Sequence, residues 1–255
     1  MPRFAANLSM MFNEHPFLER FGAAASAGFD AVEYLFPYDF EAREISGQLQ
    51  RHGLAQALFN MPPGDWSKGE RGLAALPSRK DEFRKAVKMS VDYAGIIGTP
   101  LLHMMAGNAP SGDLAARQAY RENLAFAADA TARAGVGLVV EPINRRDMPD
   151  YFLNDFNMAI DIINDLGHSN VKLQFDIYHR QILHGDVVKA LESLMPMVGH
   201  IQIASVPLRH EPGTGELNDV FIFNALDRLG YTGFVGCEYR PAGETVAGLS
   251  WMKNC

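Results

Sequence analysis

Residues 135–142 read GVGLVVEP, a glycine followed by a short apolar run that ends on a glutamate. A continuous apolar run of this length is typical of a parallel strand that is covered on both faces. The glycine ahead of it supplies the left-handed backbone conformation that ends a helix. The stretch therefore predicts a helix that ends at Gly135 and a buried strand that begins directly after it.

The same pattern recurs along the chain and gives eight units. Strands are expected at residues 3–8, 30–36, 54–61, 100–107, 137–144, 171–177, 200–206 and 234–239. A glycine precedes each strand after the first: Gly28, Gly53, Gly98, Gly135, Gly167, Gly199 and Gly230. Eight β-then-α units and 255 residues are the count and the size of a TIM barrel. We expect an α/β protein, a single-domain (β/α)₈ barrel over residues 1–255. The alternative is a doubly wound sheet, but the first strand lacks the glycine-rich loop of that fold.

Two segments between the strands carry further signals. Residues 78–98 place apolar side chains on one helix face, and Ser78 and Asp81 have the spacing of a capping box. Residues 62–77 form a connection that is too long for a simple link, and it contains several glycines and Trp66. This length is typical of a lid over an active site or of a variable surface insertion, and both interpretations stay open.

Composition excludes several classes of protein. The chain has 23 Lys+Arg and 30 Asp+Glu, a formal net charge of −7 that opposes binding to nucleic acid. It lacks the apolar run of about eighteen residues that a membrane helix needs, and its start lacks a secretory pattern. Cys237 and Cys255 are too few for a disulfide framework. We expect a cytoplasmic protein that binds neither membrane nor nucleic acid, with its oligomeric state, a homo-oligomer included, left open.

The last four strands each carry an oxygen-bearing side chain near the carboxyl end: Glu141, Asp176, Gln202 and Glu238. A carboxylate within an apolar run is costly unless it is paired or bound to a metal. In a TIM barrel this end of the strands forms the active site. Three carboxylates and one amide carbonyl suit Mg²⁺ or Mn²⁺, whereas zinc prefers His and Cys. The sequence predicts a divalent metal site, with Gln202 as its weakest member because buried glutamines more often satisfy backbone groups.

Two histidines are candidates for substrate binding. His179 follows Asp176 at a spacing of three, so we expect it in the loop past the strand, within reach of a substrate. His103 lies within the expected fourth strand, where it faces either the barrel mouth or the core. The core interpretation of His103 has slightly more weight.

Several motifs of this chain resemble those of the hydroxypyruvate isomerase family. They are residues 4–9 (FAANLS), 36–38 (FPY), 64–66 (GDW), 141–144 (EPIN), 176–179 (DIYH), 202–204 (QIA), 211–216 (EPGTGE) and 236–239 (GCEY). The family belongs to the xylose-isomerase-like barrels, together with the ketose 3-epimerases and the endonuclease IV enzymes. The resemblance covers essentially the whole chain. It implies that Glu141 and Glu238 are the acid/base pair and that Glu141, Asp176, Gln202 and Glu238 bind the metal. The epimerases have a histidine in place of Gln202.

The resemblance implies an aldose–ketose type isomerase, an intramolecular oxidoreductase acting on a short 2-oxo acid. Our first expectation is conversion of hydroxypyruvate to tartronate semialdehyde by glutamate-mediated proton transfer through an enediolate, which residues 141–144 and 176–179 favour. The alternative is conversion of 2-oxotetronate to 3-oxotetronate, which residues 9–12, 103–107 and 209–212 favour. The substrate carboxylate needs a cation, and the candidates in loops on the correct face are Arg209, Arg240 and Arg71.

Three remoter functions stay open. The chain could be a ketose 3-epimerase-like enzyme, an endonuclease IV-like nuclease, or a barrel that binds an acid sugar without catalysis. The net charge of −7 and Gln202 speak against the nuclease, whose relatives use a histidine-rich zinc cluster. Two carboxylates facing an anionic ligand speak against a simple binding protein.

Overall fold

The computed structural model describes residues 1–254 and contains a closed barrel of eight strands in the order β1 to β8. The strands are β1 Arg3–Asn7, β2 Ala31–Tyr34, β3 Ala55–Asn60, β4 Leu101–His103, β5 Gly137–Val140, β6 Val171–Asp176, β7 Val198–Gln202 and β8 Phe234–Cys237. β1 pairs in parallel with β2 and with β8, which closes the barrel. The predicted (β/α)₈ TIM barrel is confirmed.

Helices alternate with these strands. They are α1 Arg20–Ser26, α2 Ala42–His52, α3 Lys80–Ile97, α4 Leu114–Arg133, α5 Phe156–Leu166, α6 Ile177–Leu183, α7 Val187–Leu194 and α8 Asp219–Arg228. Short 3₁₀ segments lie at Phe17–Glu19, Trp66–Lys68, Pro77–Arg79, Met195–Met197 and Val246–Asn254. None of the helices in residues 1–254 has both the length and the apolar character that crossing a bilayer requires.

The chain divides by its contacts into two compact units. The first unit comprises Met1–Leu35, Arg43–Ala57 and Phe175–Cys255, and the second comprises Phe36–Ala42 and Leu58–Gln174. Cys255 lies outside the described residues, so our expectation for it stays a prediction. That residues 1–255 form a single domain is likewise still a prediction.

Small side chains form a buried cluster on the strands of the first unit. Ala5, Ala31 and Ala57 form a buried cluster, and Phe234 packs against it. In the ladder between β1 and β2, Asn7 lies opposite Glu33, and in the ladder between β7 and β8, Gln202 lies opposite Gly236. The register therefore places Asn7 beside Glu33 at the ends of β1 and β2, and it leaves Gln202 opposite a residue that has no side chain.

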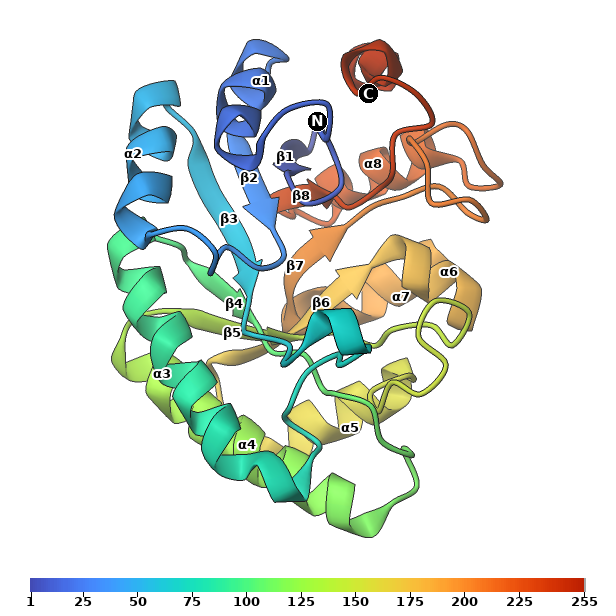
Figure 1. Ribbon diagram of the computed structural model, residues 1–255. Helices are drawn as coiled ribbons and strands as arrows, with labels where there is room; N and C mark the ends of the chain where they lie inside the picture. The colour runs from blue at the N-terminus through green and yellow to red at the C-terminus, as the bar shows by residue number, and fades with distance from the viewer. Residues whose placement is uncertain (255) are drawn as a thin grey trace. The chain divides into compact units, whose positions relative to one another are not determined.

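The second unit is covered by its two longest helices. α3 and α4 run side by side (Figure 1). Asp113 caps α4, because its carboxylate accepts hydrogen bonds from the backbone N–H groups of Ala115 and Ala116. Tyr120 of α4 packs on Phe152 with ring centres 5.1 Å apart. The aromatic pair therefore packs α4 against the loop between β5 and α5.

Two local predictions are wrong. Ser78 and Asp81 do not form a capping box, because α3 begins at Lys80 after a 3₁₀ turn that Pro77 starts, and Arg79 at the N-cap makes no side-chain cap. Gly199 does not precede its strand but lies within β7, since the turn Met195–Met197 already ends the preceding helix. The other six glycines do have positive φ, between 61° and 94°.

Each strand also ends earlier than predicted. The apolar character of residues such as Met104, Ile143 and Ile203 continues past the strand ends because the connecting loops themselves are buried. Burial and strand pairing therefore end at different residues, and the apolar pattern of the sequence shows only where burial ends.

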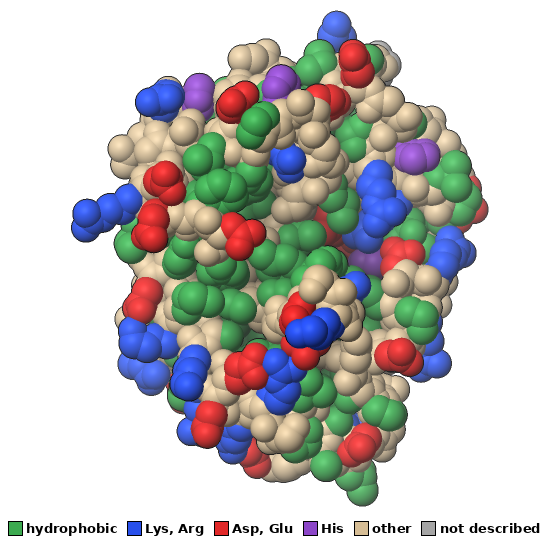
Figure 2. Space-filling view, viewed as in Figure 1, with side chains coloured by type: hydrophobic (Ala, Val, Ile, Leu, Met, Phe, Trp, Pro, Cys, Tyr) green, Lys and Arg blue, Asp and Glu red, His purple; other side chains and the backbone are tan. Residues whose placement is uncertain are grey.

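On the surface, basic and acidic side chains lie interspersed over the face in Figure 2.

Candidate active site

Two buried carboxylates of the first unit share one guanidinium. Asp176 is the last residue of β6 and Glu238 directly follows β8. Nη2 of Arg209 lies 2.8 Å from Oε2 of Glu238 and 3.6 Å from Oδ2 of Asp176. The same guanidinium lies over the ring of Tyr178, 4.8 Å from its centre. Arg209 thus faces carboxylates of the protein itself, and its role toward a substrate carboxylate stays a prediction.

Burial raises the pKa of both carboxyl groups. For Glu238 burial raises the pKa to about 8; Arg209 opposes this shift, while Asp176 and Glu33 add to it. For Asp176 burial raises the pKa to about 6, against the lowering effect of Arg209. A carboxyl group with a pKa near neutrality can both hold and release a proton at working pH, which general acid–base catalysis requires.

The carboxylate of Asp176 fits a metal ligand. Its Oδ1 accepts a hydrogen bond of 2.8 Å from the N–H of Tyr178 and so caps α6. Its Oδ2 is buried and accepts no hydrogen bond from any part of the chain that the structure describes. A buried carboxylate oxygen of this kind is stabilised by a cation. Gln202 and Glu238, on the strands that follow, add oxygen atoms of the kind that suit Mg²⁺ or Mn²⁺.

His179 lies beside this carboxylate. Its Nε2 is 3.5 Å from Oδ2 of Asp176, and the side chain is buried. The expectation that His179 lies in a loop is wrong, because Asp176 caps α6 and the chain becomes helical directly after the strand. The helix turns His179 back toward the strand end.

Glu33, at the end of β2, is a carboxylate that our sequence reasoning missed. It is fully buried and accepts hydrogen bonds from Nδ2 of Asn7 (3.0 Å), Nε2 of Gln202 (2.7 Å) and Nε2 of His200 (2.6 Å). The signal was present, since Glu33 is an acidic residue within a buried strand, as Asp176 is. Because Nε2 of Gln202 donates to Glu33, the amide nitrogen of Gln202 is turned toward this carboxylate.

Gly236 provides the space for this carboxylate. A Cβ atom at Gly236 would lie 2.2 Å from Oε2 of Glu33. We expect Gly236→Ala to displace the carboxylate from its donors and to lower the free energy of unfolding by about 1–3 kcal/mol in urea denaturation. Gly47→Ala, in helix α2 with open space around the new methyl group, is the control and should stabilise by up to about 1 kcal/mol. Equal effects of the two changes would contradict this explanation.

In the second unit, Glu141 and His103 lie together. Glu141 directly follows β5 and His103 is the last residue of β4, and both are buried. Nε2 of His103 lies 3.7 Å from Oε2 of Glu141. The core interpretation of His103 agrees with its burial, and its imidazole nevertheless lies beside a strand-end carboxylate. Its contact with a substrate stays a prediction.

The two other arginine candidates differ in their surroundings. Arg71 lies over the ring of Trp66, 3.7 Å from its centre, and donates hydrogen bonds to the carbonyl oxygens of Trp66 and Glu70. Arg71 therefore stabilises its own loop. The side chain of Arg240 is exposed, while its backbone N–H donates to the carbonyl oxygen of Arg209.

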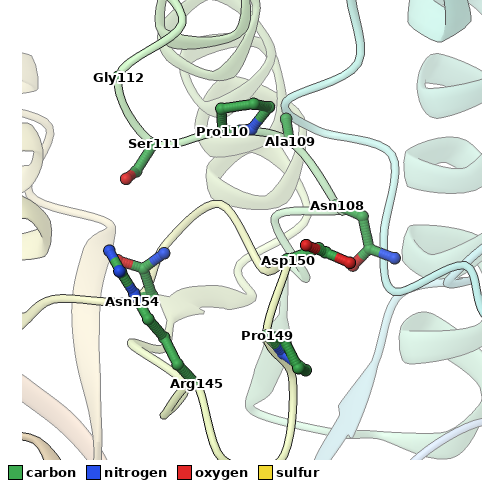
Figure 3. A pocket seen from close by; sticks show the side chains of 9 residues that line it. All are labelled: Asn108, Ala109, Pro110, Ser111, Gly112, Arg145, Pro149, Asp150 and Asn154. Carbon is green, nitrogen blue, oxygen red and sulfur yellow. The ribbon is translucent and has the colours of Figure 1, made fainter.

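A cavity of about 560 Å³ in the second unit lies between the loop that follows β4 and the loop that follows β5. Figure 3 shows its lining, with Arg145 and Asn154 side by side. Nη2 of Arg145 donates a hydrogen bond of 3.1 Å to Oδ1 of Asn154. Neither Glu141 nor His103 lines this cavity, so it is separate from the strand-end carboxylate.

The family of the protein follows from its similarity to known proteins. A family model described as xylose isomerase-like TIM barrel matches residues 21–255. The chain belongs to this family. It is 56% identical to the 2-oxo-tetronate isomerase of Cupriavidus necator, over 99% of this chain and 98% of the relative. It is 42% identical to the hydroxypyruvate isomerase of Escherichia coli, over 99% of this chain and 98% of the relative.

Among solved structures, an AP endonuclease, family 2, from Brucella melitensis is 49% identical to this xylose isomerase-like barrel and superposes with a TM-score of 0.97. The comparison covers 100% of this chain and 99% of the other. Together with the named relatives, these similarities show that the chain is an isomerase of this family. The resemblance that the sequence motifs indicated is confirmed.

Proposed function

We propose that this isomerase transfers hydrogen between adjacent carbons of a short 2-oxo acid. The observation that carries the proposal is the carboxylate of Glu238, which is buried directly after β8 with Nη2 of Arg209 2.8 Å away, and whose pKa burial raises toward neutrality, as proton transfer requires. The relative that is 56% identical to this chain is named 2-oxo-tetronate isomerase, so 2-oxotetronate is our first candidate substrate. The relative that is 42% identical is named hydroxypyruvate isomerase, so hydroxypyruvate is the second candidate. We propose that the enzyme meets this small hydroxy or oxo acid in the cytoplasm, a reducing compartment in which a buried thiol such as that of Cys237 stays reduced.

Both reactions have the same proton balance. A base takes the proton from carbon 3, the electron pair forms an enediolate with the neighbouring carbonyl, and an acid returns a proton to carbon 2, while the hydroxyl proton passes from oxygen 3 to oxygen 2 and leaves the new carbonyl at carbon 3. We assign these two roles to Glu238 and Glu141, which requires both carboxyl groups to face one substrate. Each positioned acid or base typically contributes about 10²–10⁴-fold to the rate.

We further propose that Asp176, Gln202 and Glu238, joined by Glu141, hold a Mg²⁺ or Mn²⁺ ion. When bound, the ion supplies Lewis-acid stabilisation of the charge that develops on the substrate oxygens. The buried Oδ2 of Asp176 and the all-oxygen donor set support this assignment. His103 and His179 are proposed to contact substrate, and Arg209 or Arg240 to face its carboxylate.

The experiment is ¹H NMR of 2-oxotetronate and of hydroxypyruvate, each incubated with the purified protein with and without EDTA. We expect conversion of 2-oxotetronate to the 3-oxo isomer, slower or absent conversion of hydroxypyruvate, and loss of both in EDTA. Conversion of hydroxypyruvate alone would transfer the assignment to the second candidate. No conversion of either would overturn the substrate proposal, and activity that survives EDTA would overturn the metal assignment.

A further inference from the structure

The first unit contains a buried carboxylate for which the proposed reaction has no use. Glu33 is fully buried, and its two oxygens accept three hydrogen bonds, from Asn7, Gln202 and His200. Gly236 leaves the space that the carboxylate fills. These three contacts satisfy the hydrogen-bonding capacity of both oxygens, as a buried polar group requires. The site is built around Glu33, although Glu33 itself is proposed neither as acid nor as base.

The donors of Glu33 have fixed orientations. Oδ1 of Asn7 accepts a hydrogen bond of 3.1 Å from the backbone N–H of Ser9, so the NH₂ group of Asn7 must be the one that faces Glu33. An ionised carboxylate accepts hydrogen bonds and donates none. Gln202 can therefore face Glu33 only with its NH₂ group, at 2.7 Å. Because the amide is planar, the contact of its nitrogen with Glu33 also fixes the orientation of its carbonyl oxygen.

We propose that Glu33 is a positioning residue that fixes the amide of Gln202 so that its carbonyl oxygen is presented to a divalent cation. The inference rests on the metal site of the proposed function, and it adds the reason why the amide of Gln202 can act as a metal ligand. Without an obligate acceptor behind it, the amide can turn and present its NH₂ group, which repels a cation. Residues that orient a metal ligand typically change metal affinity or activity by about 10–100-fold when they are replaced.

The test measures Mn²⁺ binding to the full-length protein by the EPR signal of the free ion, together with kcat and KM. Glu33→Gln keeps the size of the side chain beside Gly236 but offers an NH₂ group as well as a carbonyl oxygen, so Gln202 loses its single orientation. We expect the dissociation constant for Mn²⁺ to rise by about 10–100-fold, with folding preserved in urea denaturation.

Exchanging the two side-chain types between positions 33 and 202 tests whether Mn²⁺ binding can be restored. Gln202→Glu alone places two carboxylates against each other at the 2.7 Å contact and should weaken Mn²⁺ binding or folding. The double variant E33Q/Q202E restores a donor facing a carboxylate, so it should recover folding and most of the Mn²⁺ affinity that E33Q loses. Such non-additivity is the sign of a direct interaction between the two positions.

Asn7→Ser is the matched control. It removes another hydrogen bond to the same carboxylate but leaves the orientation of Gln202 unchanged, so it should lower stability without weakening Mn²⁺ binding. If E33Q binds Mn²⁺ as the unchanged protein does, or if N7S weakens binding as much as E33Q, the inference is overturned. If the unchanged protein binds no Mn²⁺ yet converts substrate, the inference falls and the isomerase proposal stands. If it binds Mn²⁺ with the expected variant effects but converts neither acid, the proposed function falls instead.

Discussion

Replacing Glu238 with glutamine should lower kcat for isomerisation by about 10²–10⁴-fold and leave the barrel folded. The amide cannot exchange a proton with a carbon atom. It can still accept a hydrogen bond from Nη2 of Arg209, which lies 2.8 Å from the carboxylate. Because burial already disfavours the charged form of Glu238, removal of that charge costs the fold little. The measurement is steady-state turnover beside urea denaturation of the same sample.

The control for this variant is Glu216→Gln. Glu216 is exposed in the loop that follows β7, and its replacement removes one negative charge from the same unit without touching a buried group. It should leave kcat unchanged. A folded E238Q variant with a nearly unchanged kcat would show that Glu238 transfers no proton in the reaction.

The second large effect is expected for Glu141→Gln, which should also lower kcat by about 10²–10⁴-fold. Glu141 is buried directly after β5, with His103 3.7 Å away, so an isosteric amide keeps the packing of the second unit. The measurement combines turnover with deuterium exchange at carbon 3 of the substrate. If Glu141 and Glu238 act on different carbons, one of the two variants retains that exchange and the other loses it.

Glu122→Gln is the matched control in the second unit. Its carboxylate is on the surface of α4 in an ion pair with Lys80, and exposed pairs of this kind contribute little to stability. We expect normal turnover. If E141Q were as active as E122Q, the acid/base pair that the family resemblance implies would be wrong for this chain.

The fold could be predicted because its signals are local. Each buried parallel strand is a short apolar run, and a glycine such as Gly98 or Gly167 ends the helix before it with a left-handed residue. The strand ends could not be placed as well. Ile203 and Met104 are as buried as strand residues, although they lie past the last ladder pair, and burial is what an apolar run records.

The candidate site was predictable only in part. Asp176 and Glu238 stand out as charges in apolar runs, and Glu33 carries the same signal. What the sequence does not show is how close residues distant in sequence come to one another, such as Arg209 and Glu238 at 2.8 Å, or His200 and Glu33 at 2.6 Å. Those contacts depend on strand register and on the backbone of Arg209, which has a φ of 58°. Neither is encoded in a short window of sequence.

The most direct test of the central claim is isomerisation of 2-oxotetronate in D₂O, with the product followed by ¹H and ²H NMR. Proton transfer through an enediolate by a carboxyl group that exchanges with solvent predicts 3-oxotetronate that carries deuterium at carbon 2. Product that forms without deuterium would mean that the same hydrogen passes from one carbon to the other without exchange, either directly or through one base shielded from solvent. That result would contradict the acid/base roles of Glu141 and Glu238.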